Sequence, residues 1–272
     1  MNIIAIARNP INSPGMEDRD RAILHAVARE LELLGDNVNI IDENETIESK
    51  NCDAIYHMSR NNFTLLKLQE VEEKGCNVIN KAQGVRNCSR KECVELMRIN
   101  NIPQPPFSII STEDYAPTNG YPLWFKKADG WSCCPQDVCF ATSQEEGTNI
   151  LSTFHERGIN EVICTQHIDG DLIKFYGVKE TFFHWYYPAP ENGKFGLEKI
   201  NGRAKQHSFN CEQLKETANE AARAIGIDIY GGDAIVTPNG DFHIIDLNDF
   251  PSFSSCREEA AKVISKLIHY KL

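Results

Sequence analysis

The sequence predicts an α/β protein built from two or three compact lobes, and three observations support that prediction. A chain of 272 residues is too long for one small hydrophobic core. Short apolar runs alternate with helical periodicity over the first third of the chain, which is typical of a parallel sheet covered by helices. Later apolar runs are joined by turn residues, which is typical of hairpins. Hydrophobic residues at 41% and charged residues at 25% are ordinary values for a globular chain.

Strands and helices are predicted in alternation over residues 1–84. The predicted strands are 2–7, 37–41, 53–56 and 76–79, and the predicted helices are 17–34 and 63–73. The polar loop 8–15 follows the first strand at the end where open α/β sheets bind ligands. It lacks the Gly-x-Gly-x-x-Gly pattern, so a dinucleotide site is not supported.

The remaining two thirds of the chain mix predicted strands with longer helices. After a strand, loop, helix and turn over residues 78–105, the predicted strands are 122–126, 138–142, 174–178 and 181–188, and a strand edge is expected within residues 161–171. The predicted helices are 145–157, 212–225 and 257–269. Gly158 and Gly226 follow the first two helices and are expected to end them.

Two carboxylates and an amide converge near the C-terminus. Asp233 opens a short apolar run, turn residues follow at 238–241, and residues 242–247 form a second apolar run. Strand alternation puts Asp246 and Asn248 on one face, and a hairpin brings Asp233 beside them. Three hard oxygen donors on one surface suit Mg²⁺. The alternative is a surface hairpin with solvated acids, which does not explain donors that face one way from apolar strands.

Charge and cysteine spacing exclude several classes of protein. A net charge of −11 argues against nucleic acid as a partner, because phosphate backbones are bound by basic surfaces. No apolar run approaches a membrane span or a signal peptide, so we expect a cytoplasmic protein without a membrane partner. The ten cysteines include no Cys-x-x-Cys pair and indicate a reducing compartment. A reactive thiol is conceivable at Cys133 or Cys134, although small half-buried residues are the commoner explanation.

Asp233 followed by Asp246-x-Asn248-x-x-Pro251 resembles the metal-binding signature of the ATP-grasp superfamily, whose usual form is Asp, then Glu-x-Asn-x-x-Pro. Aspartate at 246 is similar to the inositol phosphate kinase branch. The resemblance implies that Asp233, Asp246 and Asn248 bind magnesium, with Asp246 bridging two ions. It also implies an ATP-grasp fold with a Rossmann-like N-terminal domain at 1–84, a central subdomain at 85–168 and a C-terminal subdomain at 169–272.

Lysines upstream of the hairpin resemble those that bind ATP phosphates in the same superfamily. Residues 78–105 are similar to its entry pattern, which implies that Lys91 reaches the phosphates. The alternative for Lys91 is a solvated lysine at a helix start. Lys126 closes an apolar strand, where a lysine is costly to bury unless an anion meets it. The resemblance assigns Lys126 to the α- and β-phosphates and makes residues 129–136 a flap over the triphosphate.

Residues 161–171 resemble the adenine hinge of the superfamily. By that resemblance Gln166 occupies the hinge position, Ile168 lines the adenine pocket and Asp171 accepts from the ribose hydroxyls. His167 alternates along the same strand, and we interpret it as an ordinary packed or exposed histidine. Lys174 begins a Lys-x-Tyr strand and, by resemblance, approaches the γ-phosphate or the acceptor.

A basic run follows the aromatic strand and is a candidate clamp for an anionic small-molecule substrate. It contains Lys194, Lys199, Arg203, Lys205 and His207. An exposed cationic edge that resists aggregation explains the run as well. Arg203 is the preferred acceptor contact. Ser252, Ser254 and Ser255 lie where relatives place acceptor contacts, and they are equally good helix N-caps.

The resemblance as a whole implies an enzyme that uses ATP and Mg²⁺. Most ATP-grasp enzymes activate a carboxylate as an acylphosphate for attack by an amine, so we expect a carboxylate-amine ligase. Asp246 and the Lys174-Phe-Tyr segment favour a small-molecule kinase as the alternative. A third hypothesis is a nucleotide-binding module without turnover, which the single glycine of the flap leaves open. No pattern in the sequence indicates the oligomeric state.

Overall fold

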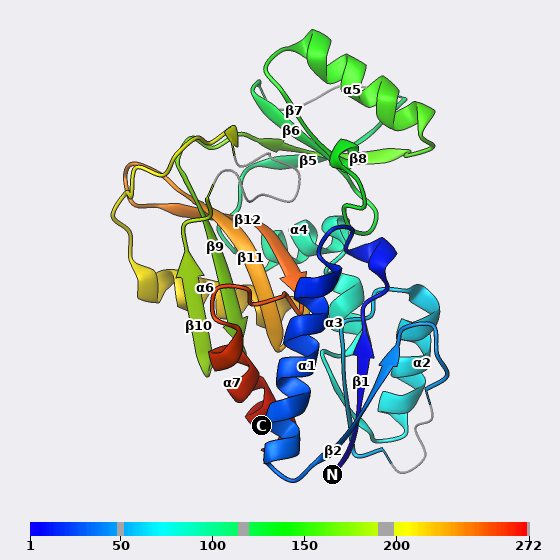
Figure 1. The fold of residues 1–272 in the computed structure, drawn as a ribbon. Helices are drawn as coiled ribbons and strands as arrows, with labels where there is room; N and C mark the ends of the chain where they lie inside the picture. Colours follow the sequence, from blue (N-terminus) through cyan, green and yellow to red (C-terminus); the bar gives the residue numbers. More distant parts are fainter. Residues whose placement is uncertain (48–51, 114–119, 190–198, 271–272) are drawn as a thin grey trace.

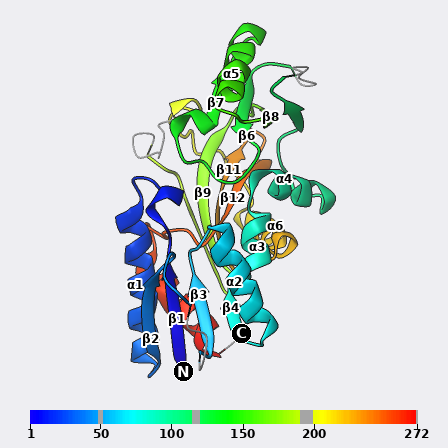
Figure 2. The ribbon, with the colours of Figure 1, turned by 90° about the vertical axis from the view of Figure 1, so that its right-hand side faces the viewer.

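A computed structural model of the chain describes residues 1–47, 52–113, 120–189 and 199–270. The described residues form three four-stranded sheets, one in each of three lobes (Figure 1). Figure 2 shows the lobes following one another along the long axis, with the N-terminal lobe at one end and the central lobe at the other. This arrangement of parallel and antiparallel sheets confirms the predicted α/β class. No described helix is long and apolar enough to cross a membrane.

The N-terminal lobe contains the parallel sheet that alternation predicts. Its strand order is β2-β1-β3-β4, made of β1 (Asn2–Ala7), β2 (Asn37–Asp42), β3 (Ala54–His57) and β4 (Asn77–Ile79). Helix α2 (Asn62–Glu73) packs on one face, where Ile4, Leu65 and Leu68 are buried together. Helix α1 (Glu17–Leu33) covers the other face, and the short helix η1 (Pro10–Asn12) precedes it.

The central lobe is an antiparallel sheet covered by one helix. Its strand order is β5-β8-β6-β7, made of β5 (Phe107–Ser111), β6 (Leu123–Lys127), β7 (Val138–Ala141) and β8 (Glu161–Gln166). Helix α5 (Gln144–Glu156) buries Leu151 and Phe154 against Phe125. Helix η2 (Pro135–Asp137) lies between β6 and β7.

The C-terminal lobe contains the predicted hairpin at the end of a second antiparallel sheet. Its strand order is β10-β9-β11-β12, made of β9 (Asp171–Val178), β10 (Phe182–Tyr186), β11 (Ile229–Val236) and β12 (Phe242–Asp249). Helix α6 (Cys211–Ile225) covers one face of this sheet. The last helix, α7 (Arg257–Tyr270), crosses to the N-terminal lobe and packs beside α1 (Figure 1).

Two short helices connect the lobes. Helix α3 (Ala82–Asn87) packs against α2, and α4 (Arg90–Ile99) packs against α6. Cys93 and Met97 of α4 are buried in the core of the C-terminal lobe, beside Leu214. The strands of the three sheets occupy separate stretches of the chain. Helix α4, however, precedes the central sheet in the sequence and packs in the C-terminal lobe. The domain limits at 84 and 168 stay a prediction.

Asn80 joins the N-terminal lobe to the C-terminal sheet. Its buried amide nitrogen donates to the carbonyl of Ile229 at 2.7 Å, and its amide oxygen accepts from the backbone N–H groups of Asp228 at 2.9 Å and Ile229 at 2.7 Å. His57 lies 2.7 Å from the Asn80 carbonyl through Nε2. Because the N–H of Ser59 donates to His57 Nδ1, the ring proton is on Nε2 and donates to that carbonyl.

We expect Asn80→Ala to lower the free energy of unfolding by at least about 2 kcal/mol, because three buried backbone groups lose their partner and each costs roughly 1–3 kcal/mol. Urea denaturation at neutral pH measures the change. Asn149→Ala, at an exposed position of α5, is the control and should change stability little. If Asn80→Ala lowers the free energy of unfolding no more than this control does, Asn80 does not stabilise the contact between the two lobes.

A second prediction concerns His57. Burial lowers the pKa of His57 to about 4, whereas the unfolded chain titrates near 6.5. The unfolded state therefore binds the extra proton between these values, so stability falls as the pH drops through that window. Between pH 7 and pH 5 we expect wild type to lose about 2 kcal/mol more than His57→Gln, measured by urea unfolding. Equal losses in both proteins would show that His57 is not the titrating group.

Candidate nucleotide and metal site

A cavity of about 370 Å³ lies where the three lobes meet. The C-terminal sheet contributes residues of β9, β11 and β12 to its lining, and the central lobe contributes β6, the hinge and the flap. The N-terminal lobe contributes residues that follow β1 and β3. The hinge is residues 166–168 and the flap is residues 129–136. The cavity is thus lined by segments that are far apart in the sequence.

The strands of the C-terminal sheet pair so that their cavity-facing side chains form rows. Lys174 on β9 is opposite Asp233 on β11, and Asp233 is opposite Asp246 on β12. This group of three is called the charged row. Next to it, Gly231 pairs with Tyr176 on one side and with Asn248 on the other. The structure therefore brings together all three residues expected to bind magnesium.

The carboxylates of the charged row are each met by nitrogen donors. Lys174 Nζ lies 3.0 Å from both oxygens of Asp233. The amide nitrogen of Asn248 donates to Asp246 Oδ2 at 2.8 Å. Two carboxylates and an amide fit Mg²⁺, which prefers oxygen ligands and keeps positions for water and phosphate. Rotation of the Asn248 amide presents its oxygen instead. Among the described residues no three His, Cys, Asp or Glu side chains form a metal cluster, and the set of Asp233, Asp246 and Asn248 has only two carboxylates beside its amide.

Lys126 and Arg90 place positive charge beside the charged row. Lys126 is half-buried, and its Nζ donates to the carbonyl of Ile245 at 3.0 Å. Burial, and secondly the nearby Arg90 guanidinium, together lower the pKa of Lys126 to about 8, while Asp246 opposes the shift. Arg90 donates to Ser132 Oγ at 2.6 Å and to the Lys127 carbonyl at 3.3 Å, so it holds the flap. An anion in the cavity would stabilise both cations.

The hinge end of the cavity is flat and largely apolar. Gln166 and Ile168 line it, as expected. Trp124 Nε1 donates to His167 Nδ1 at 3.1 Å, and the indole lies 4.9 Å from the Phe140 ring. His167 is therefore a packed residue of an aromatic group, as the sequence indicates. Other side chains that line this end are Pro105, Val138, Leu172, Ile235 and Ile245.

Lys91 lies outside the cavity, which corrects the expectation from the sequence. Helix α4 begins at Arg90, and successive helical residues point about 100° apart. Arg90 consequently faces the cavity, whereas Lys91 points to the surface and forms a salt bridge with Glu161 at 2.7 Å. Arg90 is the cation that this segment brings to the lining.

Asp171 and Arg203 also lie outside the lining. Asp171 is buried and accepts hydrogen bonds from the backbone N–H groups of Lys205 at 2.6 Å and His207 at 2.7 Å. These hydrogen bonds attach residues 205–207 to the start of β9, and the Asp171 side chain does not line the cavity. Arg203 belongs to this segment and is exposed, whereas Asn201 lines the cavity and lies 3.4 Å from the Ile168 carbonyl.

Other sequence expectations for the site fall outside the lining or the described residues. The serines at 252, 254 and 255 and the thiols of Cys133 and Cys134 are not in the lining. Cys133 is exposed, and Cys134 is half-buried beside Asp137. Lys194 lies outside the described residues.

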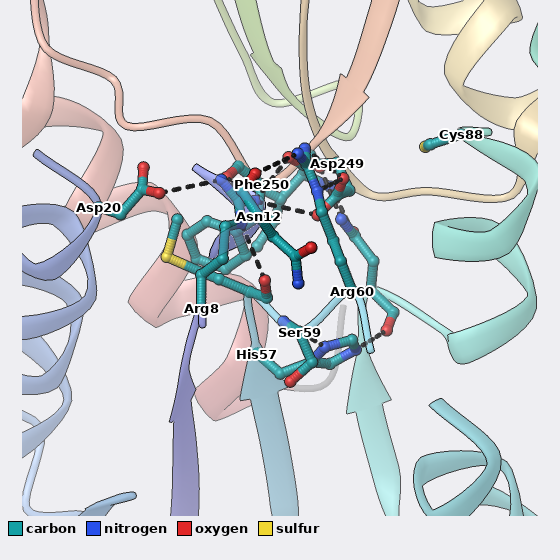
Figure 3. Close-up of polar contacts among 12 residues, drawn as sticks. Arg8, Asn12, Asp20, His57, Ser59, Arg60, Cys88, Asp249 and Phe250 are labelled. Carbon is teal, nitrogen blue, oxygen red and sulfur yellow. Dashed lines mark hydrogen bonds and ion pairs between the residues drawn. The ribbon is translucent and has the colours of Figure 1, made fainter. Parts of the chain in front are cut away.

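Sequence reasoning missed a buried ion-pair cluster at the N-terminal end of the cavity (Figure 3). Arg60 donates to Asp249 Oδ1 through Nε at 2.9 Å and pairs with it through Nη2 at 2.7 Å. Arg8 pairs with Asp249 Oδ2 and with Asp20, both at 3.1 Å. The only signal in the sequence was that Arg8 and Arg60 each follow a parallel strand at its carboxyl end.

Comparison with known proteins identifies the fold. No protein-family model and no curated protein matches the sequence. A D-alanine–D-alanine ligase from Bacillus anthracis complexed with ATP has a TM-score of 0.70 at 13% identity, over 100% of this chain and 94% of that chain. A RimK domain ATP-grasp protein from Sphaerobacter thermophilus has a TM-score of 0.69 at 13% identity, over 99% of this chain and 100% of that chain.

The chain has the ATP-grasp fold. This confirms the fold that the Asp, Asp-x-Asn-x-x-Pro motif suggests. A second structure of the Bacillus anthracis ligase matches with a TM-score of 0.69 at 13% identity, over 98% of this chain and 93% of that chain. The ATP-grasp fold therefore extends over the whole chain, including the N-terminal lobe.

Proposed function

We propose that this protein is a Mg²⁺- and ATP-dependent ligase that activates a small-molecule carboxylate as an acylphosphate for attack by an amine. The observation that carries the proposal is the convergence of Lys126 and the charged row on one cavity between lobes. The ATP-grasp fold supports it, as does its similarity to a D-alanine–D-alanine ligase that was crystallised with ATP. At 13% identity these neighbours do not indicate which acid or amine is used.

The lining suggests one orientation for ATP. The adenine fits the apolar hinge end, where Gln166 and Ile168 line the cavity and Trp124 offers a flat face. The phosphates then extend toward Lys126 and Arg90 and reach the charged row. Among the described lining residues, Arg and Lys outnumber Asp, so the cavity favours a polyanion.

Asp233, Asp246 and Asn248 are the residues proposed to hold Mg²⁺. When bound, the metal would neutralise phosphate charge and orient the γ-phosphate. Lys174 lies at the same row, and we propose that it turns from Asp233 toward the γ-phosphate or the acceptor. In-line phosphoryl transfer depends on alignment and charge stabilisation more than on a protein base. The carboxylate oxygen of the acceptor attacks the γ-phosphorus, ADP leaves, and the amine then displaces orthophosphate from the acylphosphate.

A small-molecule kinase is the second candidate function. Asp246 in place of the usual glutamate and the Lys174-Phe-Tyr segment favour it. In that case a hydroxyl group of the acceptor would attack the same phosphorus and the product would be a phosphate ester. The residues proposed to bind ATP and metal would be unchanged.

Product analysis with candidate acids, amines and polyols tests the function. We expect ADP and orthophosphate to form in equal amounts only when an acid and an amine are both present, and Asp246→Ala to lower this turnover by 100-fold or more. ADP without orthophosphate, from a single hydroxyl acceptor, would favour the kinase instead. Nucleotide-dependent thermal stabilisation without turnover would indicate a binding module. Unchanged turnover in folded Asp246→Ala protein would refute the proposed metal site.

The lowered pKa of Lys126 predicts how ATP affinity depends on pH. Beside phosphates the lysine is held protonated, so binding above pH 8 requires uptake of a proton. We therefore expect metal-free ATP affinity to fall about tenfold or more between pH 7.5 and 9.5, by linkage to this one proton. Isothermal titration measures it. Lys126→Arg keeps its charge over this range and should lose much less affinity; parallel losses in the two proteins would exclude Lys126 as the cause.

A further inference from the structure

Arg60 contacts residues of all three lobes. It follows β3 in the N-terminal lobe, and its buried side chain lines the cavity. The edge of its guanidinium pairs with Asp249 at the end of β12, as Figure 3 shows. The Cζ atom of the same guanidinium lies over the Trp131 ring, which belongs to the flap, at 4.8 Å from the ring centre. One side chain therefore links the flap to the end of the strand that carries Asn248.

The Asp249 side of this link fixes the main chain directly after Asn248. Asp249 is 1% exposed and receives both Arg8 and Arg60. Arg8 also donates to the carbonyl of Phe250 at 3.1 Å, and the N–H of Phe250 donates to Ile229 at 3.1 Å. Phe250 has a φ of +28°, in the region that residues other than glycine rarely adopt. These contacts hold a bend at Phe250, two residues beyond Asn248.

The Trp131 side of the link sets where the flap rests. Trp131 is half-buried, lines the cavity and packs against apolar residues of the N- and C-terminal lobes. A guanidinium is planar, so it can use its edge for a carboxylate and its face for an aromatic ring at the same time. A lysine ammonium in its place lacks this combination of a flat face and a bidentate edge. The flap side is also held by Arg90 through Ser132.

We propose that Arg60 is a positioning residue for the proposed reaction: its edge fixes the Asn248 end of β12 while its face seats the flap over the cavity. The Arg60 guanidinium thereby determines both where the flap rests and where Asn248 lies. Arg60 is already engaged and is not assigned as a phosphate ligand, because its Nε and Nη2 are directed to Asp249 and its Nη1 lies 3.5 Å from the Asn12 carbonyl. The inference rests on the proposed function, since it concerns how the nucleotide and Mg²⁺ are held.

Arg60→Lys is the principal test, with ADP as the probe and isothermal titration as the measurement. In the presence of Mg²⁺ we expect ADP affinity to fall tenfold or more, because Asn248 is displaced and the flap loses its seat. With EDTA we expect a smaller loss, about fivefold, because Asn248 then contributes nothing and only the contact that holds the flap is lost. Arg98→Lys, at an exposed position of α4, is the matched control and should behave as wild type in both conditions.

The flap seat is tested separately by fluorescence quenching with acrylamide in nucleotide-free protein. Emission lost in Trp131→Phe identifies the signal of Trp131. We expect quenching of that signal to increase at least twofold in Arg60→Lys and to stay unchanged in Arg98→Lys. Trp131→Leu should lower ADP affinity at least fivefold, and Trp131→Phe should restore it, because phenylalanine keeps an aromatic face over Arg60.

The outcomes separate this inference from the function on which it rests. If wild type does not bind ADP with Mg²⁺, the proposed function fails, and the quenching result alone decides whether Arg60 seats the flap. If wild type binds but folded Arg60→Lys keeps both its metal dependence and its Trp131 quenching, Arg60 is only a structural ion pair. Should Arg60→Lys not fold, equal ADP affinities in Trp131→Leu and Trp131→Phe overturn the proposal.

Discussion

The antiparallel register of β9, β11 and β12 is the constraint on which the cavity depends. It puts Lys174, Asp233 and Asp246 in one row, on the face opposite the apolar core beneath α6. A slip of one residue would turn all of these charges into that core. Gly232 contributes to the register, because a Cβ there would lie 2.4 Å from the carbonyl oxygen of Asp246. The close approach of β11 to β12 therefore requires a glycine directly before Asp233.

The N-terminal lobe is attached to this sheet by two polar joints. Asn80 satisfies the backbone of Ile229 at one, and Asp249 receives Arg8 and Arg60 at the other. An apolar contact surface tolerates sliding, whereas each of these groups finds its partner in only one relative orientation of the lobes. Breaking one would leave buried polar groups unpaired. The joints thus hold the residues after β1 and β3 at the end of the charged row.

How far the sequence predicts the site depends on whether local periodicity decides the position of a residue. Strand alternation and the hairpin predicted that Asp233, Asp246 and Asn248 lie together, and all three line the cavity. Lys91 was misplaced because the helix begins at Arg90, and one position on a helix turns a side chain by about 100°. Arg60 contacts Asp249, 189 residues away, which no local pattern encodes. Most elements and the two carboxylates of the charged row were therefore predictable, whereas β5 and the contacts between lobes were not.

The charges of the cavity are unevenly compensated, and this bears on the proposed acceptor. Arg8 and Arg60 are neutralised by Asp20 and Asp249 at the N-terminal end. Lys126, in the described part of the chain, has a carbonyl as its hydrogen-bond partner and no salt bridge. Uncompensated positive charge therefore lies between the hinge and the charged row, where the triphosphate is proposed to bind. Arg8 and Arg60 are already paired with carboxylates, so they would contribute little to binding an anionic acceptor. We infer that such an acceptor would be bound mainly by its contacts with the metal and the γ-phosphate and by the shape of the cavity.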